Sequence, residues 1–300
     1  MTVFRLVEKE RAHHAVSLLC SVLNVSRAGF YAWVGRSAHP GPRRREDLLL
    51  CELIGALYTT SRETYGAPRM RLRLRIDHGI GIGQKRAARL MRELGLVGVS
   101  KGERTTPRTT TSDPTAAPAP DRVDRDFTAT RPDEKWCADI TYIETREGYL
   151  FLALVTDVFS RRIVGWSMRD NLQAELVADA IAMSVTRRRP VAGVIHHSDR
   201  GAQYTSILVG RTLRESGVLQ SMGSVGDPWD NALQESGIGT IKAELVRRHD
   251  FLSRTQARLR VFDYIENFYN PVRSHRSLNG YSPDEFETNY HQSIAAKNAA

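Results

Sequence analysis

The sequence predicts an α/β protein in which a small, helical, basic region precedes a core built on a mixed, five-stranded type of sheet flanked by helices. In the second half of the 300 residues, β-branched and aromatic runs alternate with helical patterns, whereas the first hundred residues are mainly helical in pattern. The charge divides in a similar way. Residues 1–133 hold 23 Lys and Arg against 14 Asp and Glu, and residues 134–300 hold 20 of each. A basic arm on a neutral core favours binding of phosphates, with a purely solubilising charge as the alternative.

The first helical elements are expected within residues 10–35. An apolar run leads to a turn and then to Ser26, which can cap a short second helix, so the two form a helix-turn-helix-like pair. Its aromatic residues, Phe30, Tyr31 and Trp33, are expected in the core. A longer helix is expected from Arg43 to about Thr59, because leucines recur there at every fourth position. We interpret residues 1–99 as a helical, helix-turn-helix-like DNA-binding region.

Residues 69–76 alternate arginines with apolar side chains. The alternation fits a strand, but Met70 and Leu74 also fit one face of a helix. A clearer helix is expected from Gln84 to Glu93, closed by Gly95 at the C′ position. The basic side chains of this part are the candidate DNA contacts: Arg69, Lys85, Arg86 and Arg89.

Residues 100–133 are rich in Thr, Pro, Arg and Asp and have almost no large apolar side chains. Such a segment cannot bury enough surface to fold alone. We interpret it as a flexible linker between domains. The core is then expected over residues 134–290, followed by a disordered tail at 291–300.

The core pattern predicts strands first and helices later. The expected strands are about 136–144, 149–157, 163–168 and 193–197, and the first two flank a hairpin turn at 146–148. The expected helices are about 173–188, 206–215, 228–247 and 255–268.

Three carboxylates are the main candidate site: Asp139, Asp199 and Glu235. Asp139 lies inside an apolar strand, where an unpaired carboxylate would cost several kcal/mol, so a cation is expected beside it. Asp199 follows the last strand, at the end where α/β sheets place their ligands. Glu235 lies in the first turns of a helix. An all-oxygen ligand set favours Mg²⁺, with Mn²⁺ as a substitute, and two such ions would support in-line phosphoryl transfer.

Other polar residues near these carboxylates are candidate DNA contacts. Lys242 lies two helical turns beyond Glu235, about 10 Å along the helix, where a cation suits a phosphate. Gln203 and Tyr204 follow Asp199 in a loop and would contact DNA, with packing or fixing of the loop as the alternative.

Four motifs follow one another in the core: Trp136-x-x-Asp139-Ile140-Thr141-Tyr142, Asp157-Val158-Phe159-Ser160-Arg161-Arg162-Ile163-Val164-Gly165-Trp166, His197-Ser198-Asp199-Arg200-Gly201-Ala202-Gln203-Tyr204-Thr205-Ser206 and Asp230-Asn231-Ala232-x-x-Glu235-Ser236. They resemble those of the orfB-type transposases of bacterial insertion sequences, whose catalytic core is similar to retroviral integrase. Matches at residues 65–69, 89–91 and 269–278 extend the resemblance over nearly the whole chain.

The resemblance implies a ribonuclease-H-like core and a helix over residues 69–76. It also implies that Asp139, Asp199 and Glu235 are a catalytic triad of the DDE type, with Lys242 as the basic residue that often follows the glutamate. Such a transposase cuts double-stranded DNA at an element end and joins the freed 3′-hydroxyl to target DNA. A homo-oligomer on DNA, an upstream-frame helix-turn-helix protein as partner or fusion, and a cytoplasmic location on the bacterial nucleoid are implied as well.

One stretch departs from the family pattern. Aromatic residues commonly follow the Glu-Ser pair, whereas this chain has Gly237-Ile238-Gly239. Each glycine inside a helix costs about 1 kcal/mol relative to alanine, so a softer or more closely packed helix is expected.

Composition excludes several classes of protein. No apolar stretch approaches 18 residues and no signal-peptide pattern is present, so a soluble intracellular protein without membrane contact is expected. Cys20, Cys51 and Cys137 form no Cys-x-x-Cys pair, which argues against disulfides and against structural zinc. Two other functions stay open: a DNA-binding regulator that has lost its chemistry, and a ribonuclease-H-type nuclease that cuts without joining.

Overall fold

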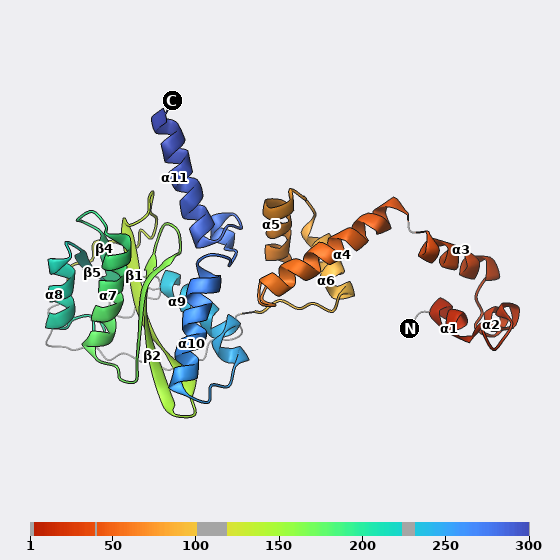
Figure 1. Cartoon of the computed structure of the whole chain (residues 1–300), viewed down its shortest axis with the longest axis horizontal. Coiled ribbons are helices and arrows are strands. Elements are labelled where there is room, and N and C mark those ends of the chain that lie inside the picture. The colour runs from red at the N-terminus through yellow and green to blue at the C-terminus, as the bar shows by residue number, and fades with distance from the viewer. Residues whose placement is uncertain (1–2, 40, 101–118, 224–231, 300) are drawn as a thin grey trace.

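The computed structural model describes residues 3–39, 41–100, 119–223 and 232–299, without the side chains of 232–235. Two helical units and a larger core follow one another along its longest axis (Figure 1). The first unit contains α1 (Val3–Glu10), α2 (Val16–Val22) and α3 (Arg27–Ala38). Ser26 caps α3 as predicted, because its hydroxyl accepts a hydrogen bond from the Gly29 N–H at 3.2 Å. Phe30 is buried and packs against Trp33 as predicted, but Tyr31 is 54% exposed, so its core assignment was wrong.

The second unit contains α4 (Pro42–Thr60), α5 (Ala67–His78) and α6 (Gln84–Glu93). Residues 69–76 are therefore helical, and the strand alternative is excluded. Gly95 follows α6 with φ near +70°, the left-handed conformation predicted for a C′ glycine. The apolar side chains that these helices bury belong to one cluster that continues into the core, so the second unit is packed on the core.

The core contains a single five-stranded mixed sheet in the order β3-β2-β1-β4-β5. The strands β1 (Lys135–Thr145), β2 (Gly148–Asp157) and β3 (Ile163–Arg169) are antiparallel, whereas β4 (Ile195–Ser198) and β5 (Leu219–Met222) run parallel to β1. This sheet confirms the predicted fold class. The sequence located only four strands, because β5 has four residues of mixed polarity and no long apolar run.

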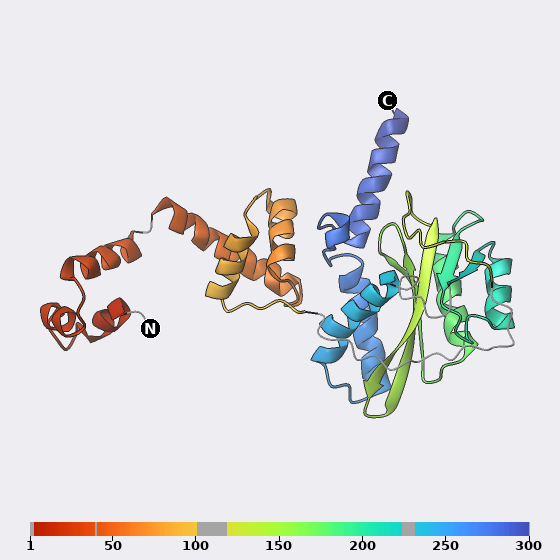
Figure 2. The same cartoon turned by 180° about the vertical axis from the view of Figure 1, so that it is seen from behind.

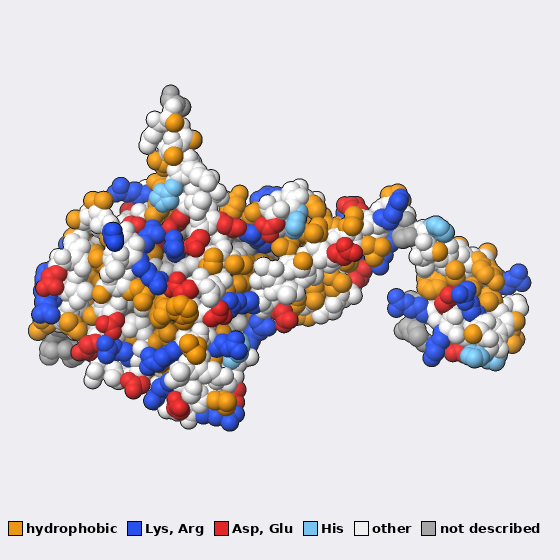
Figure 3. Space-filling view, viewed as in Figure 1, with side chains coloured by type: hydrophobic (Ala, Val, Ile, Leu, Met, Phe, Trp, Pro, Cys, Tyr) orange, Lys and Arg blue, Asp and Glu red, His pale blue; other side chains and the backbone are white. Residues whose placement is uncertain are grey.

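Helices cover both faces of the sheet (Figures 1 and 2). On one face lie α7 (Ala174–Arg188) and α8 (Ile207–Glu215), whose apolar side chains share a cluster with Trp136 and Val155. On the other lie α9 (Ala232–Glu244) and α10 (Arg254–Tyr264), which pack on Ile143 and Leu152. The chain also has short 3₁₀ turns at Val246–Arg248 and Arg276–Leu278 and a π-helical turn at Ile265–Tyr269. On the face of the core seen in Figure 3, basic and acidic side chains are interspersed.

The expected linker is shorter than the sequence suggested. Within it, residues 101–118 lie outside the described residues, but residues 119–133 pack against the core. The Arg122 N–H donates to the Ser221 hydroxyl at 2.9 Å, and the Lys135 ammonium binds the Asp126 carboxylate at 2.9 Å. Polar contacts fix this segment together with the burial of Val123 and the contact of the Phe127 ring with His197, and composition alone does not reveal them.

The expected disordered tail is also wrong, because α11 (Pro283–Ala299) includes residues 291–299. A capping box starts this helix: the Ser282 hydroxyl accepts from the Glu285 N–H at 3.2 Å, and the Glu285 carboxylate accepts from the Ser282 N–H at 2.7 Å. The Ser-Pro-x-Glu sequence at residues 282–285 is the local signal for this helix start. The base of α11 binds the core through Glu287, which accepts a hydrogen bond from Arg188 at 2.8 Å.

Every helix among the described residues is too short or too polar to cross a lipid bilayer.

Gly165 on β3 provides a test of the packing between the sheet and α7. A Cβ atom at this position would lie 2.2 Å from the Ala180 carbonyl oxygen and 2.1 Å from the Ser184 hydroxyl. We expect Gly165→Ala to lower the free energy of unfolding by about 2 kcal/mol or more, because backbone atoms must move. Gly55→Ala in α4 is the control: it meets nothing within 4 Å and should raise stability by about 0.5–1 kcal/mol. Urea unfolding measures both, and equal effects would contradict the close approach.

Candidate active site

Asp139 lies within β1, and Asp199 directly follows the end of the neighbouring parallel strand β4. Cys137 of β1 is opposite His197 of β4, and each aspartate follows two residues later. Neighbouring strands are about 4.8 Å apart and side chains alternate with a period of two. The register therefore places the two aspartates near each other, at the carboxyl end of β4.

Hydrogen bonds from the main chain hold both carboxylates. The Asp139 carboxylate accepts from the Ile140 N–H at 2.7 Å, and the Asp199 carboxylate accepts from the Gly201 N–H at 3.0 Å. Both side chains are half-buried, so a ligand has access to them.

Tyr204 shows that the two carboxylates share one environment. Its side chain is 1% exposed, and burial, followed by the charges of Asp139 and Asp199, raises the pKa of its phenol well above the usual value. Its hydroxyl has no hydrogen-bond partner among the described residues. The neighbouring Gln203 donates to the Leu172 carbonyl at 3.2 Å. These positions favour packing and loop-fixing roles over the predicted DNA contacts.

Glu235 lies on α9, but its side chain is outside the described part of the structure. Its backbone position is three residues before Ile238 and six before Ile241, both of which are buried against the sheet. Residues three or four apart share a face of a helix. The backbone of residue 235 thus lies in the first turn of a helix that covers the sheet.

Lys242 lies on the same helix, and its ammonium is 4.6 Å from the centre of the Tyr142 ring. Burial lowers the pKa of Lys242, and the charge of Asp139 opposes that shift. The charge of Asp139 thus acts on Lys242, whereas the contact of Lys242 with a DNA phosphate stays a prediction.

The predicted DNA-contacting arginines form ion pairs within the chain. Arg69 binds Glu244 at 2.8 Å. Arg86 and Arg89 both bind Asp47, at 2.7 Å each. Lys85, in contrast, is exposed and forms no ion pair among the described residues.

Two further exposed arginines on α5 were missed by the sequence reasoning. Arg71 and Arg75 lie one helical turn apart on the solvent side of this helix and form no ion pair within the described part of the chain. The spacing of four residues was the available signal, but it becomes a shared face only once the segment is helical.

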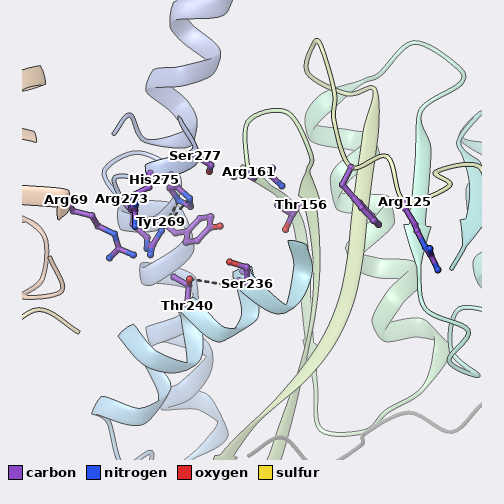
Figure 4. Close-up of a pocket in the computed structure, with 13 residues that line it drawn as sticks. Arg69, Arg125, Thr156, Arg161, Ser236, Thr240, Tyr269, Arg273, His275 and Ser277 are labelled. Carbon is purple, nitrogen blue, oxygen red and sulfur yellow. Dashed lines mark hydrogen bonds between the residues drawn. The ribbon is translucent and has the colours of Figure 1, made fainter. Parts of the chain in front are cut away.

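A cavity of about 810 Å³ lies beside the start of α9. Its walls combine α9, the end of β2, the loop after the π-helical turn, and α5 (Figure 4). Arginines line it from several of these elements, and Ser236, the neighbour of Glu235, reaches its surface. The sequence motifs contained these arginines, but nothing in the sequence indicated that they share a cavity.

The residues present fit a hard divalent cation as far as they are described. Asp139 and Asp199 supply carboxylate oxygens at the carboxyl end of β4. Carboxylate oxygens are the ligands that Mg²⁺ prefers. Among the residues whose side chains are described, no group of three His, Cys, Asp or Glu residues could hold a metal ion. The third predicted ligand, Glu235, falls outside that set.

Comparison with known protein families covers both parts of the molecule. Residues 129–228 and 216–283 match models of an integrase core domain, and residues 44–104 match an HTH-like domain. The chain is 36% identical over 293 residues to the transposase for insertion sequence element IS629 of Shigella sonnei, covering 96% of this chain and 97% of that one. The chain belongs to the IS3 family of insertion-sequence transposases.

Other relatives agree with this membership. The transposase is 36% identical to transposase InsF for insertion sequence IS3A of Escherichia coli (strain K12), over 94% of its own length and 96% of that protein. It is 39% identical to the insertion element IS600 uncharacterized 31 kDa protein of Shigella sonnei, over 92% of its length and 100% of that protein. The HTLV-2 integrase catalytic core domain in complex with magnesium is a looser neighbour, with a TM-score of 0.40 and 14% identity over 53% of this chain and 99% of that one.

The family match also locates the helix-turn-helix region of the transposase. The HTH-like domain covers α4, α5 and α6. The pair expected within residues 10–35 is present as two helices, α2 and α3, but lies outside this match. Its role in DNA binding stays a prediction.

The phenol of Tyr204 yields a test of the burial around the aspartates. We expect Tyr204→Phe to leave the free energy of unfolding unchanged or raised, since it removes a buried hydroxyl that has no partner. Tyr264→Phe is the matched control: that ring is equally buried, but its hydroxyl donates to Glu244 at 2.9 Å, so about 1–3 kcal/mol should be lost. Urea unfolding compares them. A clear loss in Tyr204→Phe would show that its hydroxyl is bonded.

His196 on β4 predicts a pH dependence of stability. Burial lowers the pKa of its imidazole from 6.5 to about 4, so the unfolded chain binds more protons between these values. His196 therefore contributes stability that is present above pH 6.5 and is lost as the pH falls toward 4, by at most about 3 kcal/mol. We expect His196→Leu to lack this part of the acid-side loss. Unfolding at several pH values measures it, and parallel curves for the two proteins would contradict the prediction.

Proposed function

We propose that this transposase cuts and joins DNA strands by metal-dependent phosphoryl transfer at Asp139, Asp199 and Glu235. The observation that carries the proposal is the parallel register of β1 and β4, which brings Asp139 and Asp199 near each other in the sheet that α9 covers. In a transposase with an integrase core, two neighbouring carboxylates at the end of a strand suit the role of metal ligands.

The side chains divide the work as follows. Asp139 and Asp199 would hold the metal, and Glu235 would complete the coordination of a second ion. Two Mg²⁺ ions, or Mn²⁺ in their place, would supply an activated water or 3′-hydroxyl and stabilise the leaving oxygen. Lys242 would contact a phosphate near Asp139, and its half-buried position limits its access to water.

Double-stranded DNA is the proposed substrate, both as the element ends and as the target. The helix-turn-helix region would bind it through the exposed cations of α5 and α6, namely Lys85, Arg71 and Arg75. Arg69, Arg86 and Arg89 would add to this surface only by exchanging their carboxylate partners for phosphates. Gln203 and Tyr204 would support the site from beneath instead of contacting DNA. Joining two DNA ends calls for at least two protomers, and an upstream-frame helix-turn-helix protein would take part as partner or fusion.

Substitution of one carboxylate tests this assignment. We expect Asp139→Asn to lower metal-dependent cleavage and joining of element-end DNA by roughly 100-fold or more, because a charged ligand of the metal is lost. DNA binding should be kept. Glu235→Gln should behave in the same way, and Asp179→Asn, an exposed residue of α7, is the control. Labelled DNA with Mg²⁺ or Mn²⁺ reports shortened and joined strands separately.

The outcomes separate the rival functions. Cleavage at the wild-type rate in Asp139→Asn would refute the catalytic assignment. Shortened strands without joined products would indicate a plain nuclease. DNA binding without either product, even with an upstream partner added, would indicate a regulator that has lost its chemistry.

A further inference from the structure

The cavity beside α9 has an unusual charge. Its described lining contains five arginines and a histidine and no carboxylate. Two of the arginines, Arg69 and Arg273, both form an ion pair with Glu244. Glu244 is buried and does not line the cavity. One negative charge therefore faces two positive ones, and the cavity keeps an excess of positive charge. Figure 4 shows that Arg69, Arg161 and Arg273 come from separate elements around the cavity.

Arg161 and Arg276 have no ion-pair or hydrogen-bond acceptor for their guanidinium groups among the described residues. Arg276 is exposed at the rim of the cavity. Arg161 is half-buried, and burial lowers the pKa of its guanidinium. The nearest carboxylate along the chain, Asp157, is engaged elsewhere: it accepts from the N–H groups of Asp133 at 2.7 Å and Ser160 at 2.8 Å. A half-buried cation without an acceptor costs free energy unless a ligand supplies one.

The backbone at Arg161 supports the same conclusion. This residue has φ near +62°, the left-handed region that glycine or asparagine would occupy more easily. Hydrogen bonds on either side, from the Arg161 N–H to the Asp157 carbonyl at 2.9 Å and from the Asp157 N–H to the Arg162 carbonyl at 2.8 Å, fix the turn. Arg125, which also lines the cavity, has φ near +60°. Strained residues of this kind concentrate at functional sites, and both of these arginines line the same cavity.

The cavity adjoins the proposed active site on the same face of the sheet. Thr156, which lines it, is opposite Cys137 of β1. Cys137 lies two residues before Asp139, so the two side chains point to the same face about 7 Å apart. On the other wall, Ser236 directly follows Glu235. The cavity therefore lies directly beside the proposed active site.

We propose that this cavity binds the phosphodiester backbone of a DNA strand next to the reacting phosphate, with Arg161 and Arg276 as its phosphate ligands. Guanidinium groups suit phosphate oxygens, to which they donate two parallel hydrogen bonds. The volume is of the size that small-ligand pockets have, enough for a nucleotide unit. The choice of DNA as the source of the phosphates rests on the proposed function. A free nucleotide offers the same chemistry and is separated by the test.

The test measures how DNA affinity depends on salt, with EDTA present so that no strand is cut. Each phosphate contact that is lost lowers the slope of log K against log salt by about one. We expect the pair Arg161→Gln and Arg276→Gln to lower the slope for a fluorescent DNA duplex by about two and to weaken binding about tenfold or more. Arg211→Gln with Arg214→Gln on α8 is the control, which removes the same charge from an exposed helix outside the cavity.

The outcomes are distinct from those of the catalytic test. An equal change in slope in both pairs, or none in the cavity pair, would overturn the proposal. Loss of binding of labelled dAMP with an unchanged DNA slope would assign the cavity to free nucleotides and would also overturn it. If Arg161→Gln alters the fold, the exposed Arg276→Gln alone should lower the slope by about one. Failure of the wild-type protein to cut DNA would count against the proposed function and leave the salt dependence interpretable.

Discussion

Glu244 at the end of α9 is the buried contact on which the relative placement of the parts depends. Its carboxylate accepts hydrogen bonds from Arg273 at 2.7 Å, from Arg69 at 2.8 Å and from the Tyr264 hydroxyl at 2.9 Å. Burial raises the pKa of Glu244, but the charges and hydrogen bonds of Arg273 and Arg69 outweigh this effect. The pKa is therefore lowered, and the carboxylate stays charged. One carboxylate thereby joins α9, α10, the loop after the π-helical turn, and the helix-turn-helix region. Removing one member of such a buried group leaves the others uncompensated, which makes the arrangement costly to loosen.

The same helix links this contact to the chemistry. Glu235 is in the first turns of α9, Lys242 is near its end, and Glu244 closes it. Ile238 and Ile241 fix the helix on the sheet through apolar burial. The position of the helix-turn-helix region and the position of the candidate catalytic glutamate are thus set by one rigid element. A molecule that must hold DNA in one part and react with it in another benefits from such a connection.

The elements that sequence reasoning found and missed differ in where their stabilisation comes from. Long apolar runs gave β1 and β2, and the periodic pattern gave α6 with the predicted ends, because these elements bury their own side chains. The strand β5 was missed because its stabilisation comes from pairing with β4 and not from an apolar run among its own four residues. The packing of residues 119–133 was missed for a similar reason. The Arg122 N–H in this segment bonds to the Ser221 hydroxyl, which is 99 positions further along the chain. The cap of α11, in contrast, is local: Ser282 and Glu285 lie three residues apart in the sequence.

The sequence by itself determined the fold class, the family and the three carboxylates at issue, because apolar periodicity and linked motifs are local properties of the chain. Only the tertiary structure decided which charges remain available. Arg86 and Arg89 meet Asp47, and Arg69 meets Glu244, whereas Arg161 and Arg276 meet no acceptor among the described residues. The physical reason is that a counter-charge can come from any distance along the chain. An ion pair forms only when the two charges lie within a few ångströms of each other, and the order of residues along the chain does not give that distance.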